Sequence, residues 1–303
     1  MLDDIVRYLR CPYCAGGLVR AGAALNCPAG HSFDIARQGY ASLLPPGASG
    51  GAAGARGAGG DTAAMVQARS DFLAAGHFAG LAVKVAEVAA AAAGVAGGGT
   101  ADGDMGDGRG GGCVVDCGAG TGYYLARLLD ARPGQAGIAL ERSRYALRRA
   151  ARAHERAGAV ACDVWQGLPV ATAAAAVAIN VFAPRNGAEL HRILRPGGLL
   201  LVVTPDQNHL RELTAALGLL AVDERKDERI RRELGPYFGL ETSRGYRTTM
   251  KLSRADVLAA ALMGPSAWHT GASDLAARAA ELPEPVPVTL SVTLSAFRRG
   301  GAR

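Results

Sequence analysis

The stretch VVDCGAGTGYYLARLL, residues 114–129, decides the fold of this 303-residue chain. An apolar run that contains Asp116 leads into a turn with three alternating glycines, and a helical pattern begins directly after that turn. The three glycines are Gly118, Gly120 and Gly122. Glycines at the carboxyl end of a strand let the backbone pass close to a ligand, beside the N-terminus of the next helix. The stretch therefore predicts a ligand site between a strand and a helix.

The spacing within this turn narrows the class of ligand. Dinucleotide-binding turns follow a strand with the order Gly-x-Gly-x-x-Gly, whereas the order here is Asp-x-Gly-x-Gly-x-Gly. This acidic form favours S-adenosylmethionine (AdoMet). Taken alone, the glycine turn is also compatible with an α/β sandwich that binds no cofactor.

Two further carboxylates end predicted strands after the turn. Glu141 ends the strand expected at 136–141, where a carboxylate is placed to bind ribose hydroxyls. Asp163 ends the strand expected at 159–164, where it is placed to contact the adenine amine. Each residue taken alone also fits an ordinary solvated strand end. Three such features at successive strand ends together favour an AdoMet site.

Strand and helix patterns alternate from residue 113 to residue 205. Apolar runs predict strands, and helical patterns lie between them; the runs are 113–118, 136–141, 159–164, 176–182 and 199–205. This alternation predicts a parallel sheet with helices on both faces. YRTTMKLS (246–253) and PVPVTLSVTLSAFRR (285–299) alternate with period two, which predicts antiparallel strands at one edge. The fold class is therefore α/β, a Rossmann-like AdoMet-dependent methyltransferase domain with a small N-terminal module.

The N-terminal module contains a cluster of metal-ligating residues. Cys11, Cys14, Cys27 and His31 have the spacing C-x2-C-x12-C-x3-H. Two short knuckles that supply two ligands each are typical of tetrahedral zinc. Because four protein ligands close the coordination sphere, we expect a structural Zn²⁺ that supplies folding energy to a small module.

Other interpretations of the cysteines remain open at this point. Four unrelated residues can cluster by chance, and C-x2-C also occurs in redox proteins, although no βαβ unit surrounds it here. Cys113, Cys117 and Cys162 fall in predicted strands, where we expect them to be small buried side chains.

Low-complexity segments suggest the domain organisation. We expect a zinc-binding module at 1–46, a flexible Gly/Ala linker at 47–60 and a methyltransferase domain at 61–303 that contains a glycine-rich loop at 94–112. Between the two segments, a helix is predicted from an N-cap at Asp61 to about residue 76, and a second helix from about 78 to 93.

The composition of the chain bears on its binding partners and its location. The formal net charge is +6, but only three of the 33 basic residues are lysines, a skew typical of high-GC coding, so the charge is weak evidence for nucleic acid. The N-terminus lacks a signal-peptide pattern, and no run of 18 apolar residues is free of breakers. We expect a cytoplasmic protein without a membrane partner.

Taken together, the motifs resemble one family nearly from end to end. The segments that carry the resemblance are CPYC, CPAGHSFDIARQGYASLLP, GDTAAMVQARSDFLAAGHF, VVDCGAGTGYY, NVFAP, LRPGGLLLVVTPDQNHLREL and LMGPSAW. They are similar to bacterial 23S ribosomal RNA (guanine-N1)-methyltransferases, the ribosomal large-subunit methyltransferase A group. The high-GC composition favours the branch that methylates nucleotide 748 and confers tylosin resistance on macrolide producers. Methylation at nucleotide 745, by the sister branch, is the alternative.

The resemblance also implies site residues and partners. It implies that Phe78 flanks AdoMet, that His209 closes over it, and that the cofactor turn comprises Gly120, Thr121, Gly122 and Tyr123. It further implies 23S rRNA as the substrate, RNA recognition by the zinc-binding module at 1–46, and a homodimer. The chain departs from the family at Phe78, where a tyrosine is common, and in its longer insertion at 94–112.

The implied reaction suggests a role for Asn180 and leaves the general base unassigned. Guanine N1 lies on the Watson–Crick edge, so the base must be unpaired or extruded before it can react. Asn180, in NVFAP, ends the fourth predicted strand, where it is placed to position the guanine; a structural amide is the alternative. No residue is assigned as general base. Two other functions remain open: a small-molecule methyltransferase with a zinc module, and a non-catalytic zinc-dependent RNA-binding protein.

Overall fold

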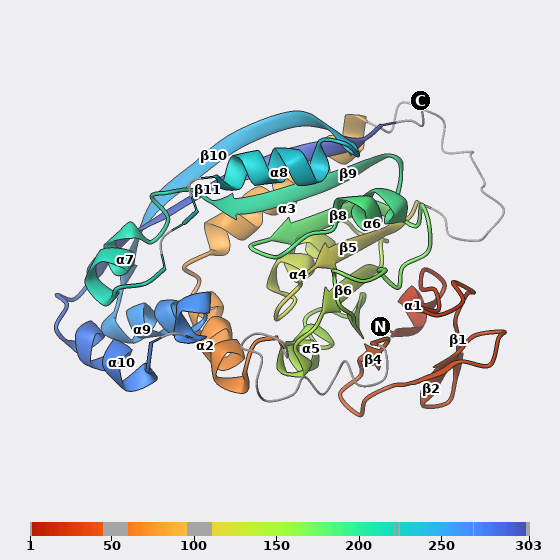
Figure 1. Ribbon diagram of the computed structural model, residues 1–303, viewed down its shortest axis with the longest axis horizontal. Coiled ribbons are helices and arrows are strands. Elements are labelled where there is room, and N and C mark those ends of the chain that lie inside the picture. The colour runs from red at the N-terminus through yellow and green to blue at the C-terminus, as the bar shows by residue number, and fades with distance from the viewer. Residues whose placement is uncertain are drawn as a thin grey trace.

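The computed structural model describes residues 2–44, 60–95, 111–220, 222–223, 225–268 and 270–300. A large eight-stranded sheet runs through the molecule in the order β10-β11-β9-β8-β5-β6-β7-β4, and a small three-stranded sheet, β1-β2-β3, lies near the N-terminus (Figure 1). In that order the large sheet consists of β10 (Phe238–Leu252), β11 (Val286–Arg299), β9 (Leu194–Pro205), β8 (Ala175–Val181), β5 (Cys113–Cys117), β6 (Gly137–Glu141), β7 (Ala157–Ala161) and β4 (Ala41–Ser42).

The pairing within the large sheet confirms the predicted fold class. Strands β9, β8, β5, β6, β7 and β4 pair in parallel, while β11 is antiparallel to both β9 and β10. The two C-terminal strands therefore form the predicted antiparallel edge. The sheet reverses its order of strand addition at β5, which is flanked by β6 and β8, and ligands bind at such a point in open α/β sheets.

Helices cover both faces of the sheet. The helical elements are α1 (Leu2–Val6), α2 (Ala63–Ala74), α3 (Ala79–Val95), α4 (Tyr123–Asp130), α5 (Arg144–Ala150), α6 (Gly187–Ile193), α7 (Arg211–Leu217), α8 (Lys226–Leu234), α9 (Arg254–Leu262), the 3-10 helix η2 (Pro265–Trp268) and α10 (Ala272–Ala280).

Central strand β5 shows how its sequence produces two cores. Val114 packs in the core that contains α3, α4 and α5, whereas Val115 packs in the core that contains α1, α6 and α8. Successive side chains of a strand point to opposite faces, so an uninterrupted apolar run is the sequence of a strand covered on both sides. All five residues of β5 are accordingly buried.

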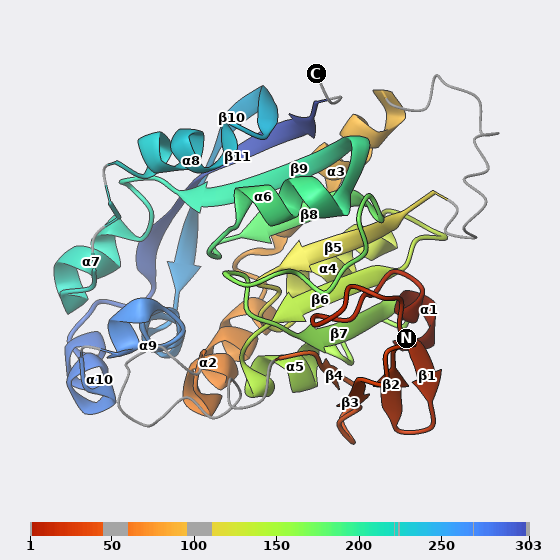
Figure 2. The same cartoon turned by 45° about the vertical axis from the view of Figure 1, so that its right-hand side comes forward.

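The N-terminal module is joined to the large sheet. It contains β1 (Val19–Ala21), β2 (Ala24–Asn26) and β3 (Ser32–Asp34), and its last strand, β4, pairs in parallel with β7 at the sheet edge (Figure 2). An isolated bridge between Leu9 and Val170 adds a second connection. The division into domains at 1–46 and 61–303 stays a prediction, and the two parts share one hydrophobic core.

Several predicted boundaries move in the structure. Helix α5 stops at Ala150, and β7 spans Ala157–Ala161 instead of 159–164, because residues 151–156 form the turns that connect them. Thr62, and not Asp61, caps α2, since the Thr62 side chain accepts a hydrogen bond from the Met65 N–H. The glycine-rich loop starts later than predicted because α3 runs to Val95; residues 96–110 and the linker at 47–59 lie outside the described residues.

Among the described residues, no single helix has the length and apolar character needed to cross a membrane. The pair Ala63–Ala74 and Ala79–Ala91 meets that requirement only when both helices, bent by 83°, are counted together.

Candidate active site and zinc centre

The glycine turn adopts a conformation that requires its glycines. Gly118, Gly120 and Gly122 have φ values of +81°, +54° and +81°, in the left-handed region that side chains disfavour. Space is restricted as well: a Cβ on Gly118 would lie 2.4 Å from the Cβ of Ala183, and a Cβ on Gly122 would lie 2.7 Å from the Cβ of Ala153. The turn is therefore held between two neighbouring loops at the carboxyl edge of the sheet.

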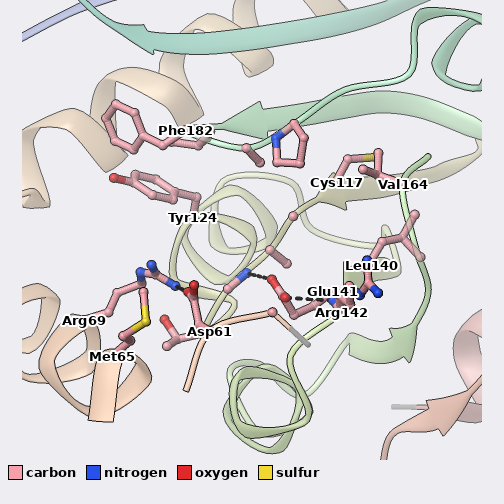
Figure 3. Close-up of a pocket in the computed structure, with 18 of the residues that line it drawn as sticks. Asp61, Met65, Arg69, Cys117, Tyr124, Leu140, Glu141, Arg142, Val164 and Phe182 are labelled. Carbon is pink, nitrogen blue, oxygen red and sulfur yellow. Dashed lines mark hydrogen bonds and ion pairs between the residues drawn. The ribbon is translucent and has the colours of Figure 1, made fainter. Parts of the chain in front are cut away.

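A pocket of about 500 Å³ opens beside this turn (Figure 3). Its walls come from the turn, the carboxyl ends of β6, β7 and β8, helix α2 and the segment around η2. Seven of the residues predicted to bind cofactor line it: Phe78, Gly118, Gly120, Thr121, Tyr123, Glu141 and Asp163. Asp116, Gly122, Asn180 and His209 are not part of the lining.

Glu141 is fixed by backbone donors. One carboxylate oxygen accepts the Gly120 N–H at 2.8 Å, and the other accepts the N–H groups of Arg142 and Ser143 at 2.7 and 2.8 Å. Burial raises the pKa of Glu141, and the three N–H groups act against that rise. Since a carboxylate has about four lone-pair sites, it keeps capacity for a ligand hydroxyl.

Asp116 lies behind the turn and is buried. Neither of its carboxylate oxygens has a hydrogen-bond partner among the described residues, and the same is true of the nearby Tyr124 hydroxyl. Burial, followed by the charge of Glu141, raises the pKa of Asp116 to about 8. Buried polar groups are normally paired. Of these two residues only Tyr124 lines the pocket, so its hydroxyl leaves donor and acceptor capacity there for a polar ligand such as AdoMet, whereas Asp116 supports the turn from behind.

Asp163 follows β7 and has two partners. Its carboxylate accepts from the Arg142 guanidinium at 2.9 Å and from the Trp165 N–H at 3.1 Å. The second bond closes a local turn after the strand, a common role for aspartate. Asp163 and Glu141 therefore lie at the same edge, linked through Arg142, as the sequence predicts for adjacent parallel strands.

His209 and Phe78 belong to an aromatic cluster. The His209 ring centroid lies 5.5 Å from that of Phe182 and 6.3 Å from that of Phe78. Phe182 and Phe78 both line the pocket, with their ring centroids 6.2 Å apart, and His209 packs behind them. The structure thus brings the two residues implied by resemblance together, with His209 behind the pocket wall.

Asn180 has the role of a structural amide, the alternative to positioning the guanine. Its side chain is fully buried, and its amide NH₂ donates to the carbonyls of Cys117 at 3.0 Å and Pro184 at 2.9 Å. Its amide oxygen accepts from the Arg185 guanidinium at 3.3 Å. Because these bonds use its polar atoms inside the protein, Asn180 holds the NVFAP loop and does not face the pocket.

Sequence reasoning missed the wall formed by α2. Arg69 pairs with Asp61 and donates to the carbonyl of Met263 at 2.7 Å, and all three residues line the pocket. Figure 3 shows Asp61, Met65 and Arg69 along one side of the cavity. The signal in the sequence was that GDTAAMVQARSDFLAAGHF is typical of the family. Arg69 is 194 positions from Met263 in the chain, so no local pattern indicates their contact.

The four predicted zinc ligands lie together in the N-terminal module. Their ligand atoms all fall within 4.8 Å of one another. His31 Nδ1 is 3.3 Å from Cys27 Sγ and 3.6 Å from Cys11 Sγ, and Cys14 Sγ is 3.6 Å from Cys27 Sγ. Tetrahedral zinc with bonds of about 2.0–2.3 Å sets its ligands roughly 3.5–3.8 Å apart, so this Cys3His set fits a structural Zn²⁺.

Comparisons with known proteins agree with a zinc-binding N-terminal module and a methyltransferase fold. Residues 9–47 match a family model described as the N-terminal zinc ribbon of RlmA. The chain is 46% identical, over 298 residues that cover 98% of it and 99% of the relative, to a Streptomyces fradiae protein named 23S rRNA (guanine(748)-N(1))-methyltransferase. The chain belongs to the 23S rRNA (guanine-N1)-methyltransferase family.

Two other proteins are similar to this chain. A Micromonospora griseorubida protein, named as a candidate 23S rRNA (guanine-N1)-methyltransferase, is 49% identical over 98% of this chain and 99% of its own length. Among solved structures, a candidate methyltransferase of Bacillus halodurans is 15% identical and aligns with a TM-score of 0.43 over 62% of this chain and 92% of its own. Membership of the methyltransferase family does not favour the small-molecule and non-catalytic interpretations.

Proposed function

We propose that this chain transfers a methyl group from AdoMet to N1 of guanosine 748 in 23S rRNA. The observation that carries the proposal is the 46% identity, over nearly both full lengths, to the relative whose name specifies guanine 748. The intact turn and the adjoining pocket support it, since they offer a site for the methyl donor at the switch point of the sheet.

Different pocket residues are proposed to contact different parts of AdoMet. In this proposal the turn at Gly118, Gly120 and Gly122 receives the donor along its backbone, Glu141 binds the ribose hydroxyls, and Asp163 faces the adenine amine. When bound, AdoMet supplies an electrophilic methyl group on its sulfonium. The protein has to align the acceptor with that methyl group and exclude water, which is a positioning task.

The substrate has to be presented as an unpaired base. Guanine N1 carries a proton on the pairing edge, so the nucleotide must leave its stack to reach the pocket. Proteins recognise such RNA elements through shape, phosphates and splayed bases. The zinc module, at 1–46 and held against the same sheet by β4, is the proposed RNA-holding surface.

Primer extension on 23S rRNA tests the function. An N1 methyl group blocks base pairing, so reverse transcription of rRNA from cells that express this chain should stop at nucleotide 748. A stop at 745 would reassign the target, and no stop at either position would refute the proposal. We further propose that expression raises resistance to tylosin, which growth assays on the drug can check.

The proposal also covers the location of the protein in the cell and its oligomeric state. Because rRNA is the substrate, we place the protein in the cytoplasm. A homodimer is proposed from the family resemblance alone, and light scattering of the purified chain would give its mass in solution.

A further inference from the structure

The residue that follows β8 is unusual in backbone and side chain alike. Phe182 has φ = +55°, in the left-handed region that bulky residues avoid. Its side chain is 39% exposed although it is a large apolar group, and it lines the pocket. Backbone strain that persists in a folded protein is concentrated at functional sites, so Phe182 needs an explanation beyond packing.

A buried network maintains this conformation. Asn180 ties the start of the loop to Cys117 and its end to Pro184. The buried Arg185 adds hydrogen bonds to Asn180 and to the carbonyl of Ala183. The Phe182 N–H donates to the carbonyl of Val203 at 3.1 Å. These contacts fix the backbone on both sides of Phe182 and leave its ring as the part that faces outward.

The ring is supported from behind and open in front. His209 and Phe78 lie against it, with centroids at 5.5 and 6.2 Å. Figure 3 places Phe182 and Tyr124 at the end of the pocket away from Glu141 and Arg142. Glu141 is the proposed ribose contact, so the Phe182 end is left for the acceptor, next to the turn that Ala183 contacts.

We propose that Phe182 is the stacking platform for the extruded target guanine. This inference rests on the proposed function, because it names the surface that receives the base. Enzymes that act on extruded bases hold them between aromatic and apolar side chains, and base–aromatic stacking depends on the ring face and not on hydrogen bonds. The exposed phenyl face at the acceptor end of the pocket meets both requirements.

The test compares variants that keep or remove the ring. Phe182→Leu retains an apolar side chain without an aromatic face, and Phe182→Trp retains the face. Phe182→Gly removes the ring at a backbone angle that glycine tolerates, so it does not depend on the strained conformation. Tyr237→Ala is the matched control, since Tyr237 is also 39% exposed and does not line the pocket.

The measurements use the full-length zinc-bound protein and an RNA hairpin that contains the target guanosine. We expect kcat to fall about 10- to 100-fold in Phe182→Leu and Phe182→Gly and clearly less in Phe182→Trp, which keeps an aromatic face, while Tyr237→Ala stays within about threefold of the parent. The Kd for AdoMet and the Kd for the hairpin should stay within about threefold, because phosphate contacts dominate RNA affinity. A hairpin with 2-aminopurine at the target should show altered fluorescence in the ring-free variants.

Two outcomes would overturn the inference alone. One is a Phe182→Leu variant as active as the parent. The other is a loss of AdoMet affinity that equals the loss of turnover, which would assign the ring to the donor. A parent protein that methylates no RNA would instead defeat the proposed function, and this inference with it.

Discussion

Replacing Gly118 with alanine tests the tight fit between the glycine turn and the NVFAP loop. At φ = +81°, a non-glycine residue costs about 1–2 kcal/mol. The new Cβ would also lie 2.4 Å from the Cβ of Ala183, and such overpacking costs about 1–3 kcal/mol more. We therefore expect Gly118→Ala to lower the free energy of unfolding by about 2–5 kcal/mol and to weaken AdoMet binding, since relief requires the loop to move.

Gly134→Ala is the matched control for this experiment. Gly134 has φ = +84°, but nothing lies within 4 Å of the position its Cβ would take. It should show the backbone cost of about 1–2 kcal/mol and no change in AdoMet affinity. Urea denaturation gives the two free energies, and calorimetric titration gives the two affinities. Equal destabilisation of both variants, with AdoMet binding intact in Gly118→Ala, would refute the contact.

Three further predictions concern the carboxylates and the metal. In Glu141→Gln the amide NH₂ replaces an acceptor, so at least one backbone N–H loses its partner; AdoMet affinity by calorimetry should fall about 10-fold, and an unchanged Kd would contradict the ribose assignment. For Asp116 the folded pKa of about 8 exceeds the ordinary 3.8, so the folded state keeps a proton that the unfolded state releases. The free energy of unfolding should then fall by about 1.4 kcal/mol per pH unit between pH 5 and 7, a slope that Asp116→Asn should lack in urea titrations. Cys14→Ser should lose zinc, as measured by atomic absorption, and rRNA methylation, while AdoMet binding remains; full activity would refute the role of the module.

The parts of the site that depend on local spacing were predictable from the sequence. The Asp-x-Gly-x-Gly-x-Gly turn and the strand ends at Glu141 and Asp163 follow from patterns within a few residues, and the structure puts Glu141 and Asp163 at one edge. The zinc ligands were predictable for the same reason, because each knuckle is a short turn. Such turns and ligand pairs depend on residues that are close together in the sequence.

The parts that depend on tertiary contacts were not predictable. Asn180 was expected at the acceptor, yet its amide is used by Cys117, Pro184 and Arg185, and no pattern in NVFAP reveals those bonds. The partner of Arg69 at Met263 and the strained backbone of Phe182 likewise depend on elements distant in the chain. Arg69, Met263 and Phe182 all line the pocket, so part of its wall depends on contacts between distant segments.

The pairing of β4 with β7 has a consequence for how the protein is made. Ala41 pairs with Val160, a residue that the ribosome adds about 120 positions later. At about 5–20 residues per second, roughly 6–24 seconds separate the two. During that interval the sheet edge that receives β4 does not exist, whereas all four zinc ligands have already been synthesised by residue 31. We therefore expect metal binding, together with the small sheet β1-β2-β3, to hold the nascent module in shape, so that a shortage of zinc acts during translation.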